Sequence, residues 1–593
     1  MAAFLVNDQD TSVMIVGSID PFVTTDGGQS FAQSASWYLG DAMHGSGSLS
    51  ENFFQTNAYV HADIRVGKSF NGVMYLGTDG YLCKSQDNGA TWTILNNGTP
   101  IRENYTLGIS QSNHFTTMIG SQDNGTSILG EDGWVEYFGA DGMEAIVHPL
   151  NPDWMIGSYQ YGGRIRTFDR GLSQTGVDPA GESGAGEADW IAPLAYDPND
   201  PFVVYHFSDE VWRSEDFGGT WEQLGAPSTF GGGEIQHAEI AENNSNSMVL
   251  TRQSKIVRSV DGGQTFSNIA VGLPVADITD IAIDPNNDSV IIVVYNKYQD
   301  DGKKVYITYN AGQNWTNITY NLNNMPIRSV VIDHSDESNI YLGAEIGVFT
   351  MPEGGNSWAA YNSELANTTV RELEINYGSN TIRAATWGRG MWEYTLKDRL
   401  DFPAILTTEI TNPPTFIQPQ EAIDQYVSSM ISYEGNLSSV YTEWSINAPT
   451  FGNVINMTNT VDSTWVSDSP LPGFPEGTKM FFKVFAVGEM GETTETYRFT
   501  YTVRNNPSIS LSELAGEEIV LYPNPNSGEF SILLGAQKSA VQLTVLSVGG
   551  EKIREAKYVN TDTLDCDLKL ASGTYFVLVQ SDGLNVVKQI VVE

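Results

Sequence analysis

The sequence is poor in cysteine and in basic residues. Its two cysteines, Cys83 and Cys566, lie far apart in 593 residues, so no disulfide framework holds the chain together and its stability must come from packing. Lysine and arginine number 30 against 72 aspartate and glutamate residues, which gives a formal net charge of −42. A chain of this charge repels phosphate backbones, which argues against a nucleic-acid-binding function.

Long apolar runs are also missing. No stretch of about 18 apolar residues occurs, so we expect no membrane-spanning helix. The start, MAAFLV, lacks the charged region and the long apolar stretch of a signal peptide. Seven histidines are too few to favour a histidine-based metal site. We therefore expect no metal or cofactor, with structural calcium held by loop carboxylates as the open alternative.

Glycine and aromatic residues, by contrast, are abundant. The chain has 58 Gly, 27 Tyr, 25 Phe and 13 Trp, and 17% of its residues are charged. This composition is typical of a folded extracellular β-protein. A length of 593 residues is too great for one hydrophobic core, and typical domain sizes predict about three or four domains.

One pattern, Ser-x-Asp-x-Gly-x-Thr-aromatic, recurs along the first two-thirds of the chain. It stands at 85–92, 214–221 and 259–266, with conservative changes at 24–31, and in weaker form at 308–315 and 351–358. The aspartate accepts hydrogen bonds from nearby N–H groups and the glycine takes a positive φ, so the pattern indicates a tight turn between two strands. We therefore predict a structural role for the residues at its third position: Asp26, Asp87, Asp216, Asp261, Asn310 and Glu353.

The spacing of this pattern sets the size of the repeating unit. Successive third positions from Asp216 to Glu353 are 45, 49 and 43 residues apart. A unit of this length holds four short strands, which is one blade of a β-propeller. The gap of 129 residues before Asp216 leaves room for two more blades, with decayed turns at 130–134 and 168–171. Eight units and a three-strand remnant at 370–396 predict a seven- or eight-bladed β-propeller over residues 1–400. We expect the remnant's missing fourth strand to come from chain near the N-terminus or from sequence outside this chain.

The recurring pattern resembles the Asp-box, or BNR repeat, of sialidases, sortilin-type domains and the xyloglucan-degrading two-propeller hydrolases. The resemblance covers roughly the first two-thirds of the chain and implies an all-β propeller. It does not imply sialidase activity, because that family needs three converging arginines and an early Arg-Ile-Pro motif. The chain has instead a late, inverted Pro326-Ile327-Arg328.

Near residue 400 the repeat stops. Residues 403–504 alternate in short strands around a central Trp444, which predicts an immunoglobulin or fibronectin III-like β-sandwich acting as a spacer. A polar linker, 505–516, then precedes a small β-sandwich at 517–593. This last module contains Tyr-Pro-Asn-Pro-x-x-Gly-x-Phe, a later Gly-x-Tyr and a lysine in its final strand: Tyr522, Pro523, Asn524, Pro525, Gly528, Phe530, Gly573, Tyr575 and Lys588.

These motifs resemble the C-terminal sorting domain of the Bacteroidetes type IX secretion system. The resemblance implies that the secretion machinery is a partner of residues 517–593, and that the chain reaches the extracellular space or the outer-membrane surface. Members of the family also carry an N-terminal export signal. We therefore expect this chain to be processed, or to be the C-terminal part of a longer precursor.

Ligands of a propeller usually bind near the central channel, on the face opposite the Asp-box turns. Loops of that face supply the residues that we predict to bind a ligand: His61, Asp63, Asp209, His237, Glu239, Trp387 and Arg389. Glycoside hydrolysis needs two carboxylates about 5 to 10 Å apart, and Asp79, Asp123 and Asp141 lie in loops of successive blades. They are the candidate catalytic residues. In the xyloglucan-active family one catalytic aspartate stands in Thr-Asp-x-Gly-Gly, which Thr78-Asp79-Gly80 partly matches.

The sequence thus favours a secreted or cell-surface protein with a binding or structural function, such as an adhesin or a component of an extracellular assembly. Its ligand would be a glycan or a protein, and self-assembly stays open. A propeller glycoside hydrolase is the first alternative and sortilin-like peptide binding is the second. Two of the Asp79, Asp123 and Asp141 carboxylates within about 10 Å of each other in an open cleft would favour hydrolysis, whereas scattered or buried carboxylates would favour binding.

Overall fold

The structure is a computed structural model of the chain. It describes residues 3–592 except 38–58, 96–97, 131–132, 182, 185–186, 226–229, 300, 334–338, 412–424, 504–519, 523–527, 548–551, 568–572 and 582–583. The chain divides into two compact units, one of residues 1–414 with 422–503 and one of residues 504–593 with 415–421. Each unit is described by itself. In the described residues, no helix is long and apolar enough to cross a membrane.

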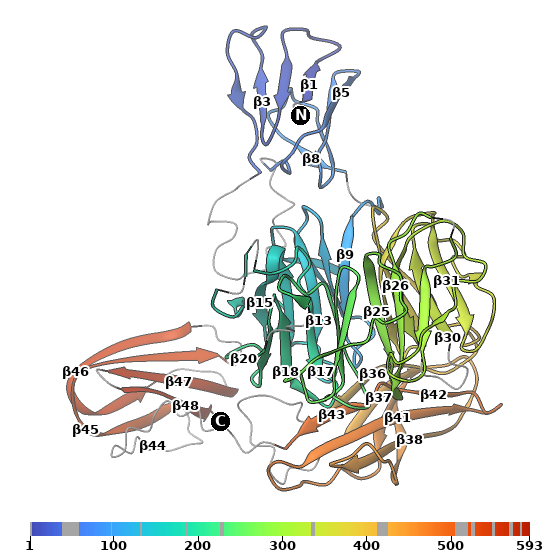
Figure 1. The fold of residues 1–593 in the computed structure, drawn as a ribbon. Coiled ribbons are helices and arrows are strands. Elements are labelled where there is room, and N and C mark those ends of the chain that lie inside the picture. The colour runs from blue at the N-terminus through green and yellow to red at the C-terminus, as the bar shows by residue number, and fades with distance from the viewer. Residues whose placement is uncertain are drawn as a thin grey trace. The chain divides into compact units, whose positions relative to one another are not determined.

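Among the described residues, eight four-stranded antiparallel sheets and one three-stranded sheet lie before residue 400 (Figure 1). Two of them come first: β1 (Ala3–Val6), β2 (Met14–Gly17), β3 (Pro21–Thr24) and β4 (Ala32–Gln33), then β5 (Val66–Phe70), β6 (Val73–Gly77), β7 (Leu82–Ser85) and β8 (Thr93–Ile94). These two sheets pack against each other through β1 and β5. They share a core that includes Leu5, Ile15, Leu76 and Trp92.

Seven further sheets follow, each with its strands in chain order from the innermost outward. Their strands are β9 (Asn104–Ile109), β10 (Thr117–Ser121), β11 (Thr126–Gly130), β12 (Gly133–Phe138); β13 (Gly142–Val147), β14 (Met155–Tyr159), β15 (Gly163–Thr167), β16 (Thr175–Gly176); β17 (Leu194–Asp197), β18 (Asp200–Phe207), β19 (Val211–Ser214), β20 (Glu222–Gly225); β21 (His237–Ile240), β22 (Met248–Arg252), β23 (Lys255–Ser259), β24 (Ser267–Asn268); β25 (Ile278–Asp284), β26 (Asn287–Tyr295), β27 (Val305–Thr308), β28 (Thr316–Asn317); β29 (Ile327–Ile332), β30 (Asn339–Ala344), β31 (Gly347–Pro352), β32 (Ala359–Ala360); and β33 (Val370–Asn376), β34 (Thr381–Thr386), β35 (Met391–Thr395). A 3-10 helix, η3 (Gln160–Gly162), follows β14.

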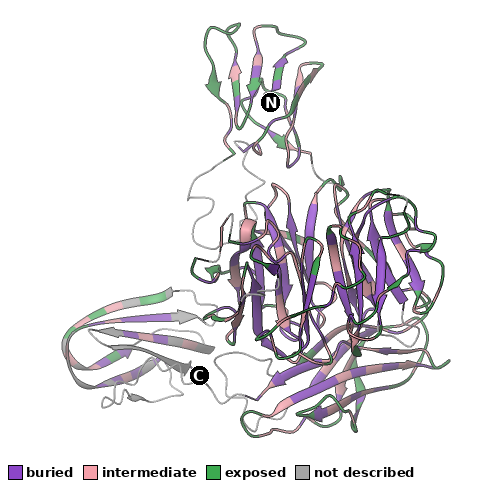
Figure 2. Ribbon diagram, in the orientation of Figure 1, coloured by how far each residue is buried: buried purple, intermediate pink, exposed green. Residues whose placement is uncertain are grey.

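The innermost strands close a ring. β9, β13, β17, β21, β25, β29 and β33 each pack on the next, and β33 packs on β9. The propeller predicted from the repeat is confirmed, and the ring has seven sheets. The sequence pattern predicted a seven- or eight-bladed ring over residues 1–400, whereas the sheets of β1–β8 lie outside the closed circle. Side chains between the sheets are buried, so the core is divided among the sheet interfaces (Figure 2).

The recurring turns join the third strand of a sheet to the fourth, as predicted. In the turn after β23, Asp261 accepts hydrogen bonds from the Thr265 N–H at 2.9 Å, the Thr265 hydroxyl at 2.6 Å and the Ser259 hydroxyl at 2.8 Å. The same contacts form at Asp26, Asp87 and Asp216. Asn310 accepts from the N–H of the fourth residue on in the same way.

Two positions depart from the pattern. Asp169, in a turn that looked decayed in the sequence, makes the Asp-box bonds to Thr167 and Ser173 at 2.7 Å each. Glu353 was predicted to act as a turn acceptor, but no hydrogen bond of this kind reaches its carboxylate within the described chain. Its turn is instead closed by the Gly355 N–H donating to the Pro352 carbonyl.

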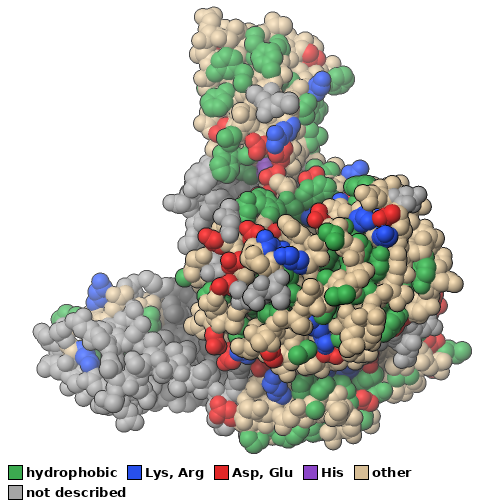
Figure 3. All heavy atoms as spheres, viewed as in Figure 1, with side chains coloured by type: hydrophobic (Ala, Val, Ile, Leu, Met, Phe, Trp, Pro, Cys, Tyr) green, Lys and Arg blue, Asp and Glu red, His purple; other side chains and the backbone are tan. Residues whose placement is uncertain are grey.

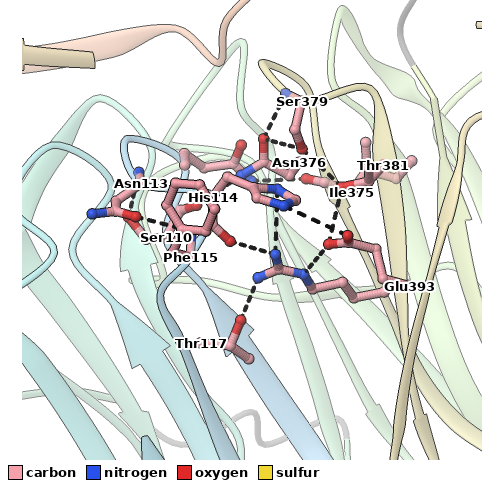
Figure 4. Close-up of polar contacts among 12 residues, drawn as sticks. Ser110, Asn113, His114, Phe115, Thr117, Ile375, Asn376, Ser379, Thr381 and Glu393 are labelled. Carbon is pink, nitrogen blue, oxygen red and sulfur yellow. Dashed lines mark hydrogen bonds and ion pairs between the residues drawn. The ribbon is translucent and has the colours of Figure 1, made fainter. Parts of the chain in front are cut away.

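Contacts between the three-stranded last sheet and the first sheet close the ring, and they include buried side chains as well as backbone hydrogen bonds from Gly388 and Gly390 to the Arg102 carbonyl. The Arg383 side chain of β34 is 3% exposed and donates to Glu393 at 2.6 Å, to the Thr117 hydroxyl and to the His114 carbonyl (Figure 4). Asn376 donates to the Ser110 carbonyl at 2.8 Å. No strand from the N-terminal region completes this sheet in the part of the chain that the structure describes. Arg383 and Asn376 therefore hold the first and last sheets together without a fourth strand.

Residues 404–502 form eight strands: β36 (Ala404–Ile410), β37 (Val427–Ser432), β38 (Leu437–Ile446), β39 (Asn453–Val461), β40 (Thr464–Ser467), β41 (Lys479–Gly488), β42 (Thr493–Glu495) and β43 (Phe499–Thr502). The strands β36 to β42 join in one hydrogen-bonded path, β43 pairs with β41 beside it, and together they enclose a common core with Trp444 packed at its edge. Side chains link these strands to the ring: Thr502 bonds to Asp200 at 2.9 Å, and Arg498 to Asn199 at 2.9 Å. The immunoglobulin-like character of this region stays a prediction.

The second unit is a five-stranded sheet of β44 (Val520–Tyr522), β45 (Glu529–Ser547), β46 (Lys552–Asp567), β47 (Gly573–Ser581) and β48 (Leu584–Val592). Phe530 is buried in its core, and Tyr575 packs against that core. Tyr522 lies in β44, Gly573 begins β47 and Lys588 lies in β48. Pro523, Asn524, Pro525 and the linker 505–516 lie outside the described residues.

Candidate ligand-binding channel

Five of the seven inner strands contain a β-bulge near their first residues. In β33, Val370 pairs with Thr386 and Glu372 pairs with Ala385, which leaves Arg371 as an extra residue. The same shift in register leaves an extra residue in four other inner strands, namely Tyr105 in β9, Thr279 in β25, Arg328 in β29, and one of Met143 and Glu144 in β13. A bulge takes a side chain out of the alternating pattern, and bulges are over-represented beside functional sites.

The bulged residues meet at a cavity of about 440 Å³, which we call the channel mouth. Tyr105, Glu144, Thr279, Arg328 and Arg371 line it from the strands. Loops that join second to third strands, or one sheet to the next, supply Asp189, Gln236, Gln253, Asp277 and Asn296. The cavity therefore opens on the face opposite the Asp-box turns.

Arg371 lies against a pair of aromatic rings at the channel mouth, Tyr105 and Trp387, whose centres are 5.0 Å apart. Its guanidinium carbon is 5.7 Å from the centre of the Tyr105 ring and 5.4 Å from that of Trp387. The Trp190 indole donates to the Tyr105 hydroxyl at 3.2 Å, which fixes that ring. Among the described residues, no hydrogen bond or ion pair reaches the guanidinium. Burial lowers the pKa of Arg371, and the charge of nearby Arg328 lowers it further.

Arg328, the neighbouring cation, is already neutralised. Its Nε donates to Glu345 at 2.8 Å, and the Thr369 hydroxyl donates to the other oxygen of Glu345 at 3.0 Å. Burial opposes ionisation of Glu345, but the bonds from Arg328 hold its pKa below the usual range. Arg328 is thus bound by Glu345, whereas the N–H donors of Arg371 have no acceptor in the described protein and are available to a ligand in the cavity.

Carboxylates on β13, β21, β25 and β33 line the channel below the mouth: Glu144, Glu239, Asp280, Glu372 and Glu374. Burial raises the pKa of Asp280 to about 7 and that of Glu374 to about 8, and raises the pKa of Glu239 and Glu372 well above the usual range. Asp280 accepts two backbone N–H bonds at 2.8 Å, and Glu372 accepts one from Leu107 at 2.5 Å. The channel therefore holds acids that are partly protonated near neutral pH.

The far end of the channel is a second cavity of about 300 Å³. Tyr497, which follows β42, forms part of its wall together with Tyr196 and Tyr377. The Tyr377 and Tyr497 rings are stacked with their centres 6.5 Å apart, and Tyr497 is buried. The β36–β43 region was predicted to be a spacer, yet it contributes this side chain to the channel.

The three candidate catalytic aspartates are held by other groups. Arg65 donates to both oxygens of Asp79, at 2.6 and 2.5 Å. Asp141 is 8% exposed and accepts from the Asp123 N–H at 2.7 Å and from Gln160 at 2.6 Å. Burial raises the pKa of Asp123, and the charges of Asp141 and Asp79 raise it further, so the three groups lie close enough to interact.

On the surface, acidic and basic side chains gather around the β5–β8 sheet (Figure 3).

The predicted binding residues fall into two groups. His237 and Glu239 of β21 line the channel, and Trp387 contacts Arg371 at its mouth. Burial lowers the pKa of His237 to about 4, so its ring is neutral. The remaining predicted residues do not line the channel. His61 Nε2 donates to the Asp123 carbonyl at 2.7 Å, and Arg389 donates to the Gly388 carbonyl. Asp63 and Asp209 are exposed.

Sequence reasoning missed the side chains that line the mouth and the channel most closely: Tyr105, Arg328, Arg371, Asp280, Glu372 and Glu374. A signal for them exists. The segment Val370–Ile375 alternates between apolar and polar residues, except that Arg371 and Glu372 are two consecutive polar residues. Such an interruption is the sequence pattern of a bulge in a strand with one buried face. Metal sites gain no support, because no group of three or more His, Cys, Asp or Glu is placed to hold an ion among the described residues. Structural calcium stays a prediction.

Two family models match the chain. One, described as sortilin, neurotensin receptor 3, matches residues 209–345, and one described as the secretion system C-terminal sorting domain matches residues 520–593. Comparison with curated proteins gave no match.

Several solved structures are similar to the chain. It resembles a GH74 enzyme of Niastella koreensis at 14% identity and a GH74 xyloglucanase of Xanthomonas campestris at 16% identity, each with a TM-score of 0.46 over 66% of this chain and 59% of the other. It also resembles YCF48 of Cyanidioschyzon merolae, at 13% identity and a TM-score of 0.40 over 51% of this chain and 98% of the other. The chain thus spans 59% of the length of the two GH74 enzymes. At such identities and TM-scores the likeness says nothing about activity or ligand.

The closed ring, its aspartate-stabilised turns and the family match over 209–345 agree on the first part of the chain, and the match over 520–593 identifies the last. The protein is an Asp-box β-propeller protein that carries a C-terminal sorting domain of the type IX secretion system, which exports it to the cell surface or the extracellular space.

Proposed function

We propose that this exported protein is a binding protein that takes its ligand at the channel mouth. The observation that carries the proposal is the set of five bulged inner strands, which turn side chains of different chemistry into one cavity. Its volume, about 440 Å³, lies in the range of small-molecule sites. A propeller with a purely structural function needs no bulges in its inner strands, because regular strands pack against one another without them.

The contacts of the candidate aspartates favour binding over hydrolysis. A general acid and a base or nucleophile must both be free to meet the substrate. Both oxygens of Asp79 are engaged by Arg65, and both oxygens of Asp141 accept hydrogen bonds inside the protein. Asp123 is then left without a second free carboxylate, which hydrolysis requires.

A bulky side chain at the channel mouth tests the proposal. Asn296 is exposed and lines the cavity, so Asn296→Trp fills it without disturbing the core. Glycan and peptide arrays are probed with the full chain and with this variant. We expect the wild type to bind one ligand class and Asn296→Trp to lose most of that binding, because the ligand and the indole compete for the same space.

Asn268→Trp is the matched control. Asn268 is exposed on β24, the outermost strand of its sheet, and takes no part in the channel lining. This variant should bind as the wild type does. Equal binding by Asn296→Trp and the wild type would place the ligand elsewhere and overturn the proposal.

A further inference from the structure

We infer that the ligand of the channel mouth is a sugar acid, whose carboxylate binds Arg371 and whose hydroxyls bind the polar groups around it. The inference rests on the proposed binding function and names the ligand class. It starts from Arg371, whose five N–H donors have no protein acceptor among the described residues. Other interior arginines of the ring are satisfied: Arg164 donates to Ala192, Pro193 and His206, and Arg383 to Glu393.

The surroundings of Arg371 hold its guanidinium in place for an anion. The paired rings of Tyr105 and Trp387 lie 5.7 and 5.4 Å from it, and these contacts need no hydrogen bond from the guanidinium edge. A planar guanidinium with a free edge matches the two oxygens of a carboxylate in a bidentate pair. Because Arg328 is bound by Glu345, Arg371 is the cation that remains for the ligand.

The rest of the channel mouth favours a ligand rich in hydroxyl groups. Gln253 and Asn296 offer both donors and acceptors, whereas Thr279 already donates to the Ile327 carbonyl and Gln236 to Asp189. Five carboxyl groups of the same cavity can accept from ligand hydroxyls: Glu144, Asp189, Asp277, Asp280 and Glu372. The aliphatic lining consists of Ile191 and Ile278, which leaves no apolar pocket for a large peptide side chain. A volume of about 440 Å³ accommodates a ligand of one or two sugar rings. A polyhydroxylated carboxylate fits these features better than a peptide terminus does.

Isothermal titration calorimetry of the full chain with D-glucuronate and D-galacturonate tests the inference. Glucose and galactose, which lack the carboxylate, are the matched ligands. We expect the uronates to bind at least about tenfold more tightly than the neutral sugars, because the bidentate pair is lost without the carboxylate. Arg371→Met should remove this preference, and Arg371→Lys should restore part of it, since lysine keeps the charge but not the planar fork.

Arg399→Met is the matched protein control. Arg399 also lies over an aromatic ring, 4.5 Å from the centre of Phe402, but it is outside the channel lining. Its variant should keep the preference for uronates, and thermal unfolding of all three variants shows whether each is folded. Equal affinity for uronates and neutral sugars, or an unchanged preference in folded Arg371→Met, overturns the inference.

Two further results separate this inference from the proposed function. A peptide with a free C-terminus, tested beside its C-terminal amide, provides the other source of a carboxylate. If the free peptide binds through Arg371 and the uronates do not, the sugar-acid assignment falls while the binding function stands. If neither binds and Asn296→Trp changes nothing on the arrays, the proposed function falls as well.

Discussion

Two sets of carboxylates in this protein behave in opposite ways. In the Asp-box turns, hydrogen bonds from the Thr265 hydroxyl and N–H and from Ser259 lower the pKa of Asp261 to about 2. In the ring channel, burial raises the pKa of Asp280 to about 7 and that of Glu374 to about 8. The residue types are the same, so the difference comes from their neighbours. Turn acids are surrounded by donors, whereas channel acids are removed from bulk water and face one another.

This contrast separates structural acids from candidate functional acids. The turn carboxylates recur because each turn between third and fourth strands needs the same acceptor. Four channel carboxylates recur as well, because Glu144, Glu239, Asp280 and Glu372 are each the third residue of an inner strand; Glu374 lies two residues further along β33. Acids of both kinds therefore repeat in the sequence, and the structure shows that the turn acids stabilise single turns whereas the inner-strand acids meet in the channel.

The channel acids predict the largest effect, a loss of stability as pH rises. In the unfolded chain Asp280 and Glu374 ionise near the ordinary pKa of about 4, whereas in the folded protein they keep their protons to about pH 7 and 8. Between these values unfolding releases protons, so the free energy of unfolding falls as pH rises and levels off above pH 8. We expect these two groups to contribute a loss of several kcal/mol, at about 1.4 kcal/mol per pKa unit, measured as a falling thermal midpoint from pH 5 to pH 8.5.

Glutamine at the β33 positions sharpens this test. The double variant Glu372→Gln with Glu374→Gln removes two of the buried acids, so its midpoint should fall less between pH 5 and pH 8.5. Glu409→Gln, at an exposed position on β36, is the control and should follow the wild type. A double variant with an unchanged pH dependence would mean that these carboxylates ionise as freely in the folded protein as in the unfolded chain.

Much of the fold could be predicted from the sequence, because repeated turn chemistry reports local structure. The Ser, Asp, Gly and Thr of one turn lie within eight residues, so the residues that form its hydrogen bonds can be recognised from a short stretch of sequence. The ring closure could not be predicted this way. It depends on Arg383 reaching Thr117 and His114, which are distant in sequence, and on β1 packing against β5 and not against β33. Neither contact leaves a periodic signal.

The candidate site was predicted less completely than the fold. His237, Glu239 and Trp387 could be found from loop and strand positions, since the face of a propeller that carries ligands is known from its strand order. Arg371 and Tyr105 could not, because alternation assigns a residue to one face of a strand and a bulge reverses that assignment. A search for paired polar residues at the start of inner strands would have found Arg371.

A smaller effect is expected from a turn acid. Asp87→Ala removes the acceptor of the Thr91 N–H at 2.9 Å, the Thr91 hydroxyl at 2.6 Å and the Ser85 hydroxyl at 2.8 Å. Because the turn is open to water, which replaces part of these bonds, we expect a cost of about 1 kcal/mol in the free energy of unfolding. Burial opposes ionisation of Asp87, but the bonds from Thr91 and Ser85 lower its pKa overall. The cost should therefore be constant from pH 5 to pH 8.5 and shrink below about pH 4, as the carboxylate of the parent protein takes up its proton.

The smallest effect is expected when the same residue becomes asparagine. The turn after β27 already contains Asn310, whose side-chain oxygen accepts from the Asn314 N–H at 2.9 Å and from the Thr308 hydroxyl at 2.9 Å. Asp87→Asn should keep the equivalent bonds to Thr91 N–H and Ser85 and lose the charge-assisted bond from the Thr91 hydroxyl, for a cost of about 0.5 kcal/mol. Chemical denaturation of both variants beside the parent measures the difference. A cost for Asp87→Asn as large as that for Asp87→Ala would show that charge, and not the geometry of the acceptor, holds these turns together.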